Sequence, residues 1–270
     1  MTYREHDPTG PWRREIACAW TATTGPAPAD PMAVVPDGCA DVLWSSTRGT
    51  VIVGPMTRPS VPDFPAGTEH VALRLRPGRT ERVLGVPASA LIDLNVPVAD
   101  VVGDAGRRLD ERLAAAEGTH GRLAALTQLP GLAPAVELDR AALAALAWLV
   151  GGPTRHVADA ADRVGLSARQ LQRRVVTAIG YGPKRFQRVV RVQRVLAAGP
   201  ARLGDLAQLA ADLGFTDQAH LTREVGQLTG RPPTGALTRG RATLVSGTSK
   251  RPEVVVGQAA RAPGAAPRAA

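Results

Sequence analysis

A glutamine and two arginines share one face of a helix that the sequence predicts over residues 167–179. Arg169, Gln172 and Arg173 recur at i, i+3 and i+4, which places them opposite an apolar stripe that contains Leu171. Arginine can pair with two acceptors on the edge of guanine, and glutamine can do the same with adenine. This spacing suits the reading of base edges in a DNA groove, although a polar face of this kind can also be merely solvated.

A second helix later in the chain carries a similar outer face. Gln218, Thr222 and Arg223 lie opposite the apolar positions Leu221 and Val225. The two segments form a repeat with an offset of 50 residues, in which Leu171, Arg173, Val175, Gly180 and Pro183 match Leu221, Arg223, Val225, Gly230 and Pro233. A duplicated unit with the same inner and outer faces favours DNA binding over two unrelated scaffolds.

Each copy is predicted to be a short helix, a glycine turn and a longer helix. Gly165 and Gly214 can adopt the left-handed conformation that the turn needs. Ser167 followed by Gln170 has the spacing of a capping box. The periodicity predicts helices at 139–150 and at about 156–164, 167–179, 183–198, 205–213 and 217–229.

The segment 183–198 between the copies is long enough to hold them apart. At about 1.5 Å per residue it spans roughly 24 Å, which suits recognition helices spaced near one DNA turn of about 34 Å. Lys184, Arg185 and Arg188 on its polar side are predicted to contact phosphates.

Positive charge is concentrated in the C-terminal half of the chain. Residues 1–135 hold 13 Arg against 15 Asp and Glu, for a net charge of −2. Residues 136–241 hold 16 Lys and Arg against 8 acids, for +8, and residues 242–270 carry +3. A basic half beside a near-neutral one favours a polyanionic partner for the basic half.

The first 135 residues read as a small β-rich unit followed by helices. Apolar and polar residues alternate from His70 to Arg76, which predicts a strand in a sheet with one buried face. Helices are expected from Asp104 to Glu117, ending at Gly118, and over 123–129. Residues 242–270 are rich in Ala, Gly and Pro without periodicity, and a disordered tail is expected there.

Several residues outside the repeat could take part in chemistry, and each has a structural alternative. Cys39 could be a redox or ligand-contacting thiol or a half-buried turn residue, and Cys18 is expected in the core. His220 could contact phosphate or pack. Four arginines could bind an anionic effector or lie on a solvated sheet face, namely Arg74, Arg76, Arg79 and Arg82.

The chain shows no spacing typical of a metal site, a nucleotide loop or a hydrolase nucleophile, so neither catalysis nor a cofactor is expected. It has no apolar run of membrane-spanning length, and its N-terminus lacks an apolar signal region, so a cytoplasmic protein is expected.

Over about 138–238 the sequence resembles the AraC family of bacterial transcriptional regulators. The strongest piece is AADLGFTDQAHLTREVGQLTGRPPTGAL, and LSARQLQRRV and GYGPKRFQRVVRVQRVL resemble the first recognition helix and the linker helix. The resemblance implies two units in successive major grooves. It places base-reading residues at Arg169, Gln172, Arg173, Gln218, Ala219, Thr222 and Arg223. Val225-Gly226 and Gly235-Ala236-Leu237 depart from the family pattern, which implies a weaker second unit.

The N-terminal pieces PDGCADVLW, VGPMT and LRLRPGRTERVLGVPASAL are similar to a poorly characterised domain that precedes AraC-type units. That similarity implies a role in sensing or dimerisation for residues 1–135, ahead of a DNA-binding domain at 136–241. The expected partners are double-stranded DNA, RNA polymerase, a small-molecule effector and a second copy of the chain, with no membrane. The alternative is an enzyme or ligand-binding module in residues 1–135 whose helical half only aids assembly.

Overall fold

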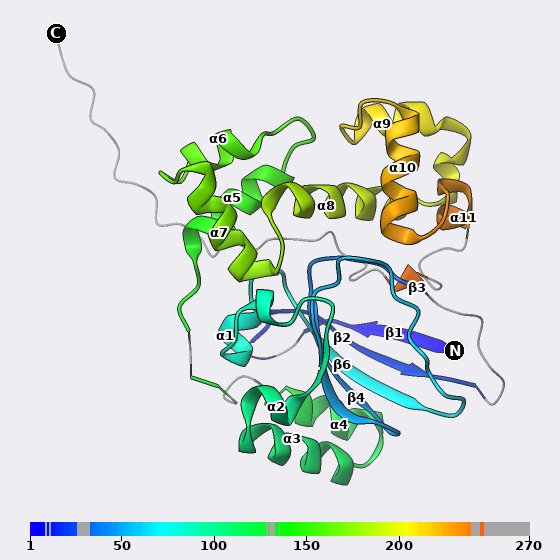
Figure 1. The fold of residues 1–270 in the computed structure, drawn as a ribbon. Coiled ribbons are helices and arrows are strands. Elements are labelled where there is room, and N and C mark those ends of the chain that lie inside the picture. The colour runs from blue at the N-terminus through cyan, green and yellow to red at the C-terminus, as the bar shows by residue number, and fades with distance from the viewer. Residues whose placement is uncertain are drawn as a thin grey trace.

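The computed structural model describes residues 1–8, 10, 12–25, 33–127, 129, 133–134, 136–238 and 244–245. Within them, a six-stranded sheet with helices against it forms the N-terminal part, and helices alone form almost all of the rest (Figure 1). The predicted fold class, an α+β unit followed by an all-α region, is confirmed. None of the described helices combines the length and apolarity needed to cross a membrane.

The large sheet is antiparallel throughout, in the order β1-β2-β6-β4-β5-β7. Its strands are β1 (Thr2–His6), β2 (Ile16–Thr23), β4 (Ala40–Ser45), β5 (Gly49–Val53), β6 (Glu69–Leu75) and β7 (Asn95–Pro97). The strand predicted over 70–76 is the central β6. A short parallel pair joins β3 (Ala33–Val34) to β8 (Leu244–Val245). Thus two residues of the predicted disordered tail form a strand, and the rest of that tail lies outside the described residues.

One face of the sheet packs against helices that follow it in the chain (Figure 1). Val71, Leu73 and Leu75 of β6 share a core with Leu109 and Leu113. The helices of this part are α1 (Thr80–Leu84), η1 (Ala88–Ala90), α2 (Val98–Val102), α3 (Asp104–Ala115) and α4 (Gly118–Leu126). The sequence located α3 but not the one-turn helices α1 and α2, which are too short to show a period. The helix predicted over 123–129 is α4, which begins earlier, at Gly118, and ends earlier, at Leu126.

The opposite face of β6 is also buried, and the prediction of a single buried face is wrong. His70, Ala72 and Arg74 are 2%, 0% and 3% exposed. Burial of Arg74 is tolerated because its Nε and Nη2 donate to the two carboxylate oxygens of Asp41, each at 2.8 Å. A charge paired in this way can lie in a core, which an alternation pattern cannot reveal.

The helical half contains every helix that the sequence predicted there, each within two residues of its expected bounds. The helices are α5 (Arg140–Val150), α6 (Val157–Asp162), α7 (Ala168–Ile179), α8 (Pro183–Ala198), η2 (Pro200–Asp205), α9 (Leu206–Asp212), α10 (Gln218–Thr229) and α11 (Pro233–Thr238). Among the helices described in this half, η2 and α11 were not predicted.

The two halves pack closely against each other. Ala33 and Val35 belong to the same apolar cluster as the helical half, and the Gln193 side chain donates to the backbone oxygen of Pro36 at 2.7 Å. A Cβ at Gly38 would lie 2.7 Å from the ring of Phe186, so glycine is needed where the N-terminal part meets α8. The N-terminal part therefore fixes the position of the linker helix.

Candidate nucleic-acid interface

The first repeat folds as predicted into two helices around a glycine turn. α6 leads to Gly165, with a φ of +66°, and α7 begins after Ser167. The Ser167 Oγ accepts from the Gln170 backbone N–H at 3.2 Å, and the Gln170 side chain accepts from the Ser167 N–H at 2.8 Å, which confirms the capping box. Leu171 is fully buried on the inner face of α7. The predicted base-reading residues Arg169, Gln172 and Arg173 are all exposed on the outer face.

The second repeat has the same design with a different cap. Gly214 has a φ of +73°, and a Cβ there would lie 2.6 Å from Pro153, so the turn is tightly enclosed. The Asp217 side chain caps α10 by accepting from the His220 N–H at 2.6 Å. Leu221 and Val225 are fully buried. The outward residues are exposed, namely Gln218, Ala219, Thr222 and Arg223.

His220 packs within the second unit. Its ring meets Phe215 edge-on, with centroids 5.5 Å apart, and its Nδ1 accepts from the Thr216 N–H at 3.2 Å. These contacts favour the packing interpretation of His220 over a phosphate contact.

The linker helix α8 binds the second unit through an ion pair that the sequence did not reveal. The Arg188 Nε lies 2.7 Å from a carboxylate oxygen of Glu224, and its Nη2 donates to Gln227 at 2.6 Å. Arg191 donates to the Gly214 backbone oxygen at 2.9 Å. Arg188, predicted to contact phosphate, therefore holds α10 against α8, and residue spacing along one helix gives no sign of a partner 36 residues away.

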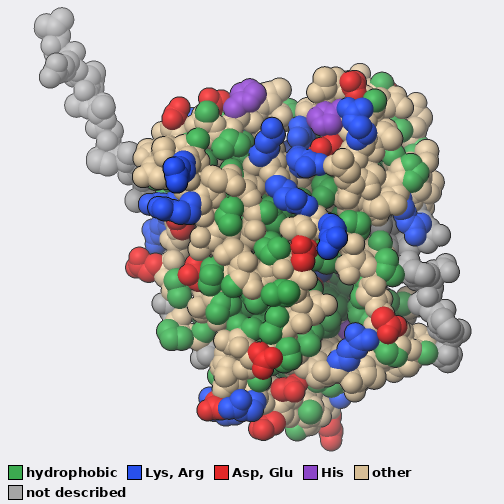
Figure 2. All heavy atoms as spheres, in the orientation of Figure 1, with side chains coloured by type: hydrophobic (Ala, Val, Ile, Leu, Met, Phe, Trp, Pro, Cys, Tyr) green, Lys and Arg blue, Asp and Glu red, His purple; other side chains and the backbone are tan. Residues whose placement is uncertain are grey.

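The other two predicted phosphate contacts lie in different environments. Lys184 is exposed, whereas Arg185 is half-buried and donates to the Thr57 backbone oxygen in the N-terminal part. Figure 2 shows Lys and Arg side chains gathered over the middle of the helical half on this face. The basic surface is present, but part of its charge is used for internal contacts.

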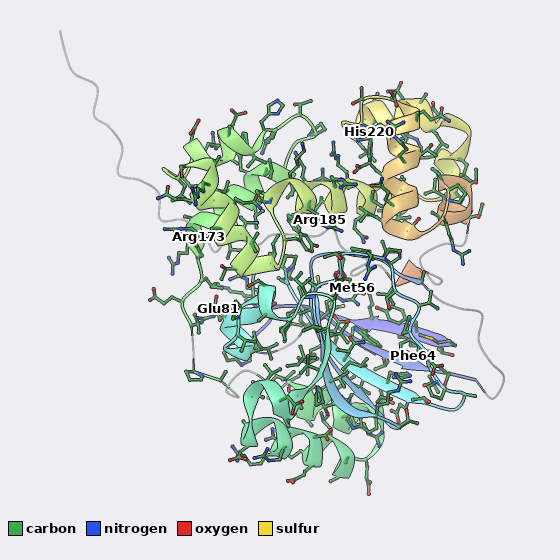
Figure 3. All side chains as sticks on the ribbon, viewed as in Figure 1. Met56, Phe64, Glu81, Arg173, Arg185 and His220 are labelled. Carbon is green, nitrogen blue, oxygen red and sulfur yellow. The ribbon has the colours of Figure 1, made fainter. Side chains whose placement is uncertain are left out.

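The C-terminal part of α7 lies beside the N-terminal unit. A cavity of about 220 Å³ separates Arg173, Arg174 and Thr177 of α7 from Glu81 and other residues near α1 (Figure 3). DNA-reading helices contact bases mainly through their N-terminal residues. The open end of α7, which carries Arg169, is thus the end that such contact requires.

The two thiols have properties of structural cysteines. Cys18 is buried, and burial raises the pKa of its thiol to about 12. Burial also raises the pKa of the Cys39 thiol well above its ordinary value, and its backbone N–H donates to Asp37 in a turn. Since the thiolate is the reactive form, these environments favour the turn interpretation of Cys39.

The described residues include no group of three or more His, Cys, Asp or Glu side chains placed to hold a metal.

The four arginines of the predicted anion site do not lie together on a solvated face. Arg74 and Arg79 are 3% and 4% exposed, and burial lowers the pKa of Arg79. Arg82 binds Glu15 at 3.4 Å and the Val136 backbone oxygen at 3.1 Å. The solvated-face alternative is therefore wrong for Arg74 and Arg79.

Replacing Ser167 with alanine is expected to destabilise the first unit. Ser167→Ala removes one half of the capping box and should lower the free energy of unfolding by about 1 kcal/mol. Thr177→Ala is the control, because Thr177 is exposed on the same helix and its hydroxyl donates only to the backbone oxygen of Arg173. Denaturant unfolding should separate the two variants, and equal stabilities would show that the cap contributes nothing.

Two family models match the chain. Residues 160–239 match a helix-turn-helix domain of the AraC type, and residues 4–97 match a domain of unknown function, DUF6597. The C-terminal region is an AraC-type helix-turn-helix domain. This match supports DNA-binding transcription regulation by the protein. Among curated proteins, none matches this sequence.

Solved structures of ToxT from Vibrio cholerae are similar to this chain at low identity. ToxT from strain O395 is 14% identical, with coverage of 80% of this chain and 92% of that chain and a TM-score of 0.41. Wild-type ToxT from strain SCE256 with bound unsaturated fatty acid is 11% identical, with coverage of 80% and 90% and a TM-score of 0.41. The O395 protein bound to (E)-4-(8-methylnaphthalen-1-yl)but-3-enoic acid is 11% identical, with coverage of 88% and 98% and a TM-score of 0.39.

Proposed function

We propose that this regulator binds promoter DNA by inserting α7 and α10 into successive major grooves. Arg169, Gln172 and Arg173 would read base edges from the first unit, and Gln218, Thr222 and Arg223 from the second. The observation that carries this proposal is that both helices bury the matching apolar face and expose these side chains. Arginine, glutamine and threonine side chains can distinguish base pairs by their contacts with base edges in the major groove.

Among the predicted phosphate contacts, Lys184 is the one that the proposal retains unchanged. It is exposed on α8 between the two units. Arg185 and Arg188 would have to exchange Thr57 and Glu224 for phosphate, so we assign them first to holding the interface and only second to DNA.

Residues 136–241 would thus form the DNA-binding domain, and residues 1–135 a domain that senses an effector without catalysing a reaction. Contacts such as Gln193 with Pro36 connect the two parts. Contact with RNA polymerase, formation of a homodimer and action in the cytoplasm stay predictions.

The experiment is selection of bound sequences from random DNA with the full-length protein, followed by titration of the selected site at several salt concentrations. Each neutralised phosphate releases about 0.9 counterions, so affinity should fall at least about tenfold between roughly 50 and 200 mM salt. Scrambled DNA of equal length is the control and should bind more weakly at every salt concentration. Failure to enrich any sequence, or an affinity independent of salt, would refute the proposal.

A further inference from the structure

The two DNA-binding units touch each other directly, in addition to being joined by α8. The loop 151–156, between α5 and α6, meets the turn of the second unit (Figure 1). A Cβ added to Gly214 would lie 2.6 Å from the Cβ of Pro153 and 2.7 Å from its backbone oxygen. A Cβ at Gly165, the turn glycine of the first unit, would have no neighbour within 4 Å in the described part of the chain. Both glycines have a positive φ, so the contact at Gly214 comes from the other unit and not from the turn.

The loop 151–156 is held in a defined position on the first unit. The guanidinium of Arg155 lies over the ring of Trp148, 4.8 Å from its centroid, and donates to the Trp148 backbone oxygen at 2.5 Å. Gln187 of α8 donates to the Arg155 backbone oxygen at 2.9 Å. The surface that Pro153 presents to Gly214 is therefore anchored to both α5 and α8.

One turn of α8 binds both sides of this contact. Arg191 donates to the Gly214 backbone oxygen at 2.9 Å, and its guanidinium lies 5.2 Å from the centroid of the Phe215 ring. Arg194 donates to the backbone oxygen of Val150, the last residue of α5. Residues three apart are neighbours on a helix surface. Two adjacent arginines thus connect one helix to both units beside the point where the units touch.

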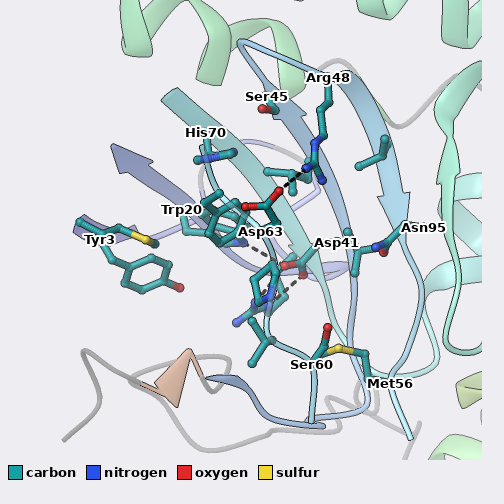
Figure 4. Close-up of a pocket in the computed structure, with 18 of the residues that line it drawn as sticks. Tyr3, Trp20, Asp41, Ser45, Arg48, Met56, Ser60, Asp63, His70 and Asn95 are labelled. Carbon is teal, nitrogen blue, oxygen red and sulfur yellow. Dashed lines mark hydrogen bonds and ion pairs between the residues drawn. The ribbon is translucent and has the colours of Figure 1, made fainter. Parts of the chain in front are cut away.

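The bonds of these two arginines act on the main chain. Arg191 and Arg194 are half-buried, and burial lowers the pKa of Arg191. The buried Arg74 of the sheet is held differently, because it donates to the Asp41 carboxylate at 2.8 Å beside a cavity of about 250 Å³ (Figure 4). A bond to a side chain fixes that side chain, whereas a bond to a backbone carbonyl fixes the segment that carries it. Cations are favourable at the carbonyls that end a helix.

We infer that the two DNA-binding units form one rigid body, in which the contact of Pro153 with Gly214, closed by Arg191 and Arg194, sets the spacing of the two DNA half-sites that the protein accepts. The inference rests on the proposed function. It makes Arg191 and Arg194 positioning residues that determine specificity without contacting a base. Inserting one base pair moves a half-site by roughly 3.4 Å and rotates it by roughly 35°, which a rigid body cannot follow.

A spacing series on the selected DNA tests the inference with the full-length protein. One base pair is inserted or removed between the half-sites, and the affinity is compared with that for the original site at one salt concentration. The unmodified protein should lose at least about tenfold, since base contacts of one unit are lost. Arg191→Met combined with Arg194→Met keeps the apolar stems and removes the donors. It should lose about threefold or less, because a loosely held unit can follow the moved half-site. A tenfold loss in this folded variant would overturn the inference.

A matched pair of glycine variants tests the direct contact between the units. Gly214→Ala and Gly165→Ala impose similar backbone strain, because both residues have a positive φ. Only Gly214→Ala pushes against Pro153. The spacing penalty should fall to about threefold or less in Gly214→Ala and stay at least about tenfold in Gly165→Ala. The same penalty in both variants would show that the contact does not set the spacing.

Two controls on α8 separate positioning from charge and from general loosening. Lys184→Met removes an exposed charge, so it should weaken binding at every spacing equally and leave the penalty unchanged. Gln193→Leu breaks a bond of the same turn to Pro36 of the N-terminal part, at 2.7 Å, which holds neither unit, so the penalty should also remain. Loss of the penalty in either control would contradict the assignment to Arg191 and Arg194.

A measurement without DNA keeps the inference separate from the proposed function. Spin labels at Ala158→Cys of α6 and Ala211→Cys of α9, both exposed, report the distance between the units. Cys39→Ser removes the other partly exposed thiol. The distance distribution should be narrow in the otherwise unmodified protein and broader when Arg191→Met and Arg194→Met are added. Equal widths would refute the rigid body. If selection enriches no DNA, the proposed function fails, and the distances still decide whether the arginines hold the units together.

Discussion

Arg173→Ala is expected to weaken binding to the selected DNA site by roughly 5- to 150-fold and to leave binding to scrambled DNA nearly unchanged. A bidentate contact between arginine and guanine discriminates by roughly 1–3 kcal/mol, which corresponds to that range. Arg173 is exposed on the outer face of α7, midway along the helix, and also lines the cavity next to Glu81. The measurement is the affinity of the full-length variant for both DNAs at one salt concentration.

Two control variants distinguish loss of base reading from loss of a nearby charge or of a phosphate contact. Arg174→Ala removes the neighbouring arginine of α7, which pairs with Asp139 at 3.4 Å and is not among the predicted base-reading residues, so it should change discrimination little. Lys184→Ala should weaken selected and scrambled DNA equally, because a phosphate contact carries no sequence information. Equal losses on both DNAs for Arg173→Ala, or none in a normally folded variant, would contradict its role as a base reader.

Asp41→Ala is expected to lower the free energy of unfolding by about 3–5 kcal/mol, because it leaves the charge of Arg74 buried without its main partner. Arg74 is 3% exposed, and its next nearest carboxylate oxygen, on Asp37, lies 3.7 Å away. The Trp20 Nε1 also loses the acceptor to which it donates at 3.0 Å. The melting temperature should fall by roughly 6–20 °C, measured by thermal unfolding.

Two further variants show whether the buried pair is the cause. Asp41→Leu combined with Arg74→Met replaces both charges with apolar groups and should recover most of the lost stability. Arg48→Ala breaks an ion pair whose side chains are 57% and 86% exposed, so its effect should stay within about 1 kcal/mol. The explanation fails if Asp41→Ala melts like Arg48→Ala.

The sequence alone was sufficient to predict the helices of the DNA-binding half and the faces that they bury. Their signals are local, because the apolar period, the capping pair Ser167 and Gln170 and the turn glycines Gly165 and Gly214 all lie within a few residues of the feature that they define. The repeat added a second independent copy of the same signals. For these reasons the outward positions of α7 and α10 could be named before the fold was known.

The tertiary structure decided which of the charged residues are free to meet DNA or a ligand. Arg188 finds Glu224 and Arg74 finds Asp41 across 36 and 33 residues of chain, and no period within one element predicts such partners. The same holds for His70, which the alternation placed on the outer face of a strand although it is 2% exposed. Its ring packs against that of Phe64, six residues earlier in the chain, with centroids 4.4 Å apart. Local periodicity thus fixed which face each side chain takes, whereas the packing of distant segments fixed whether that face meets water, a counter-charge or a cavity.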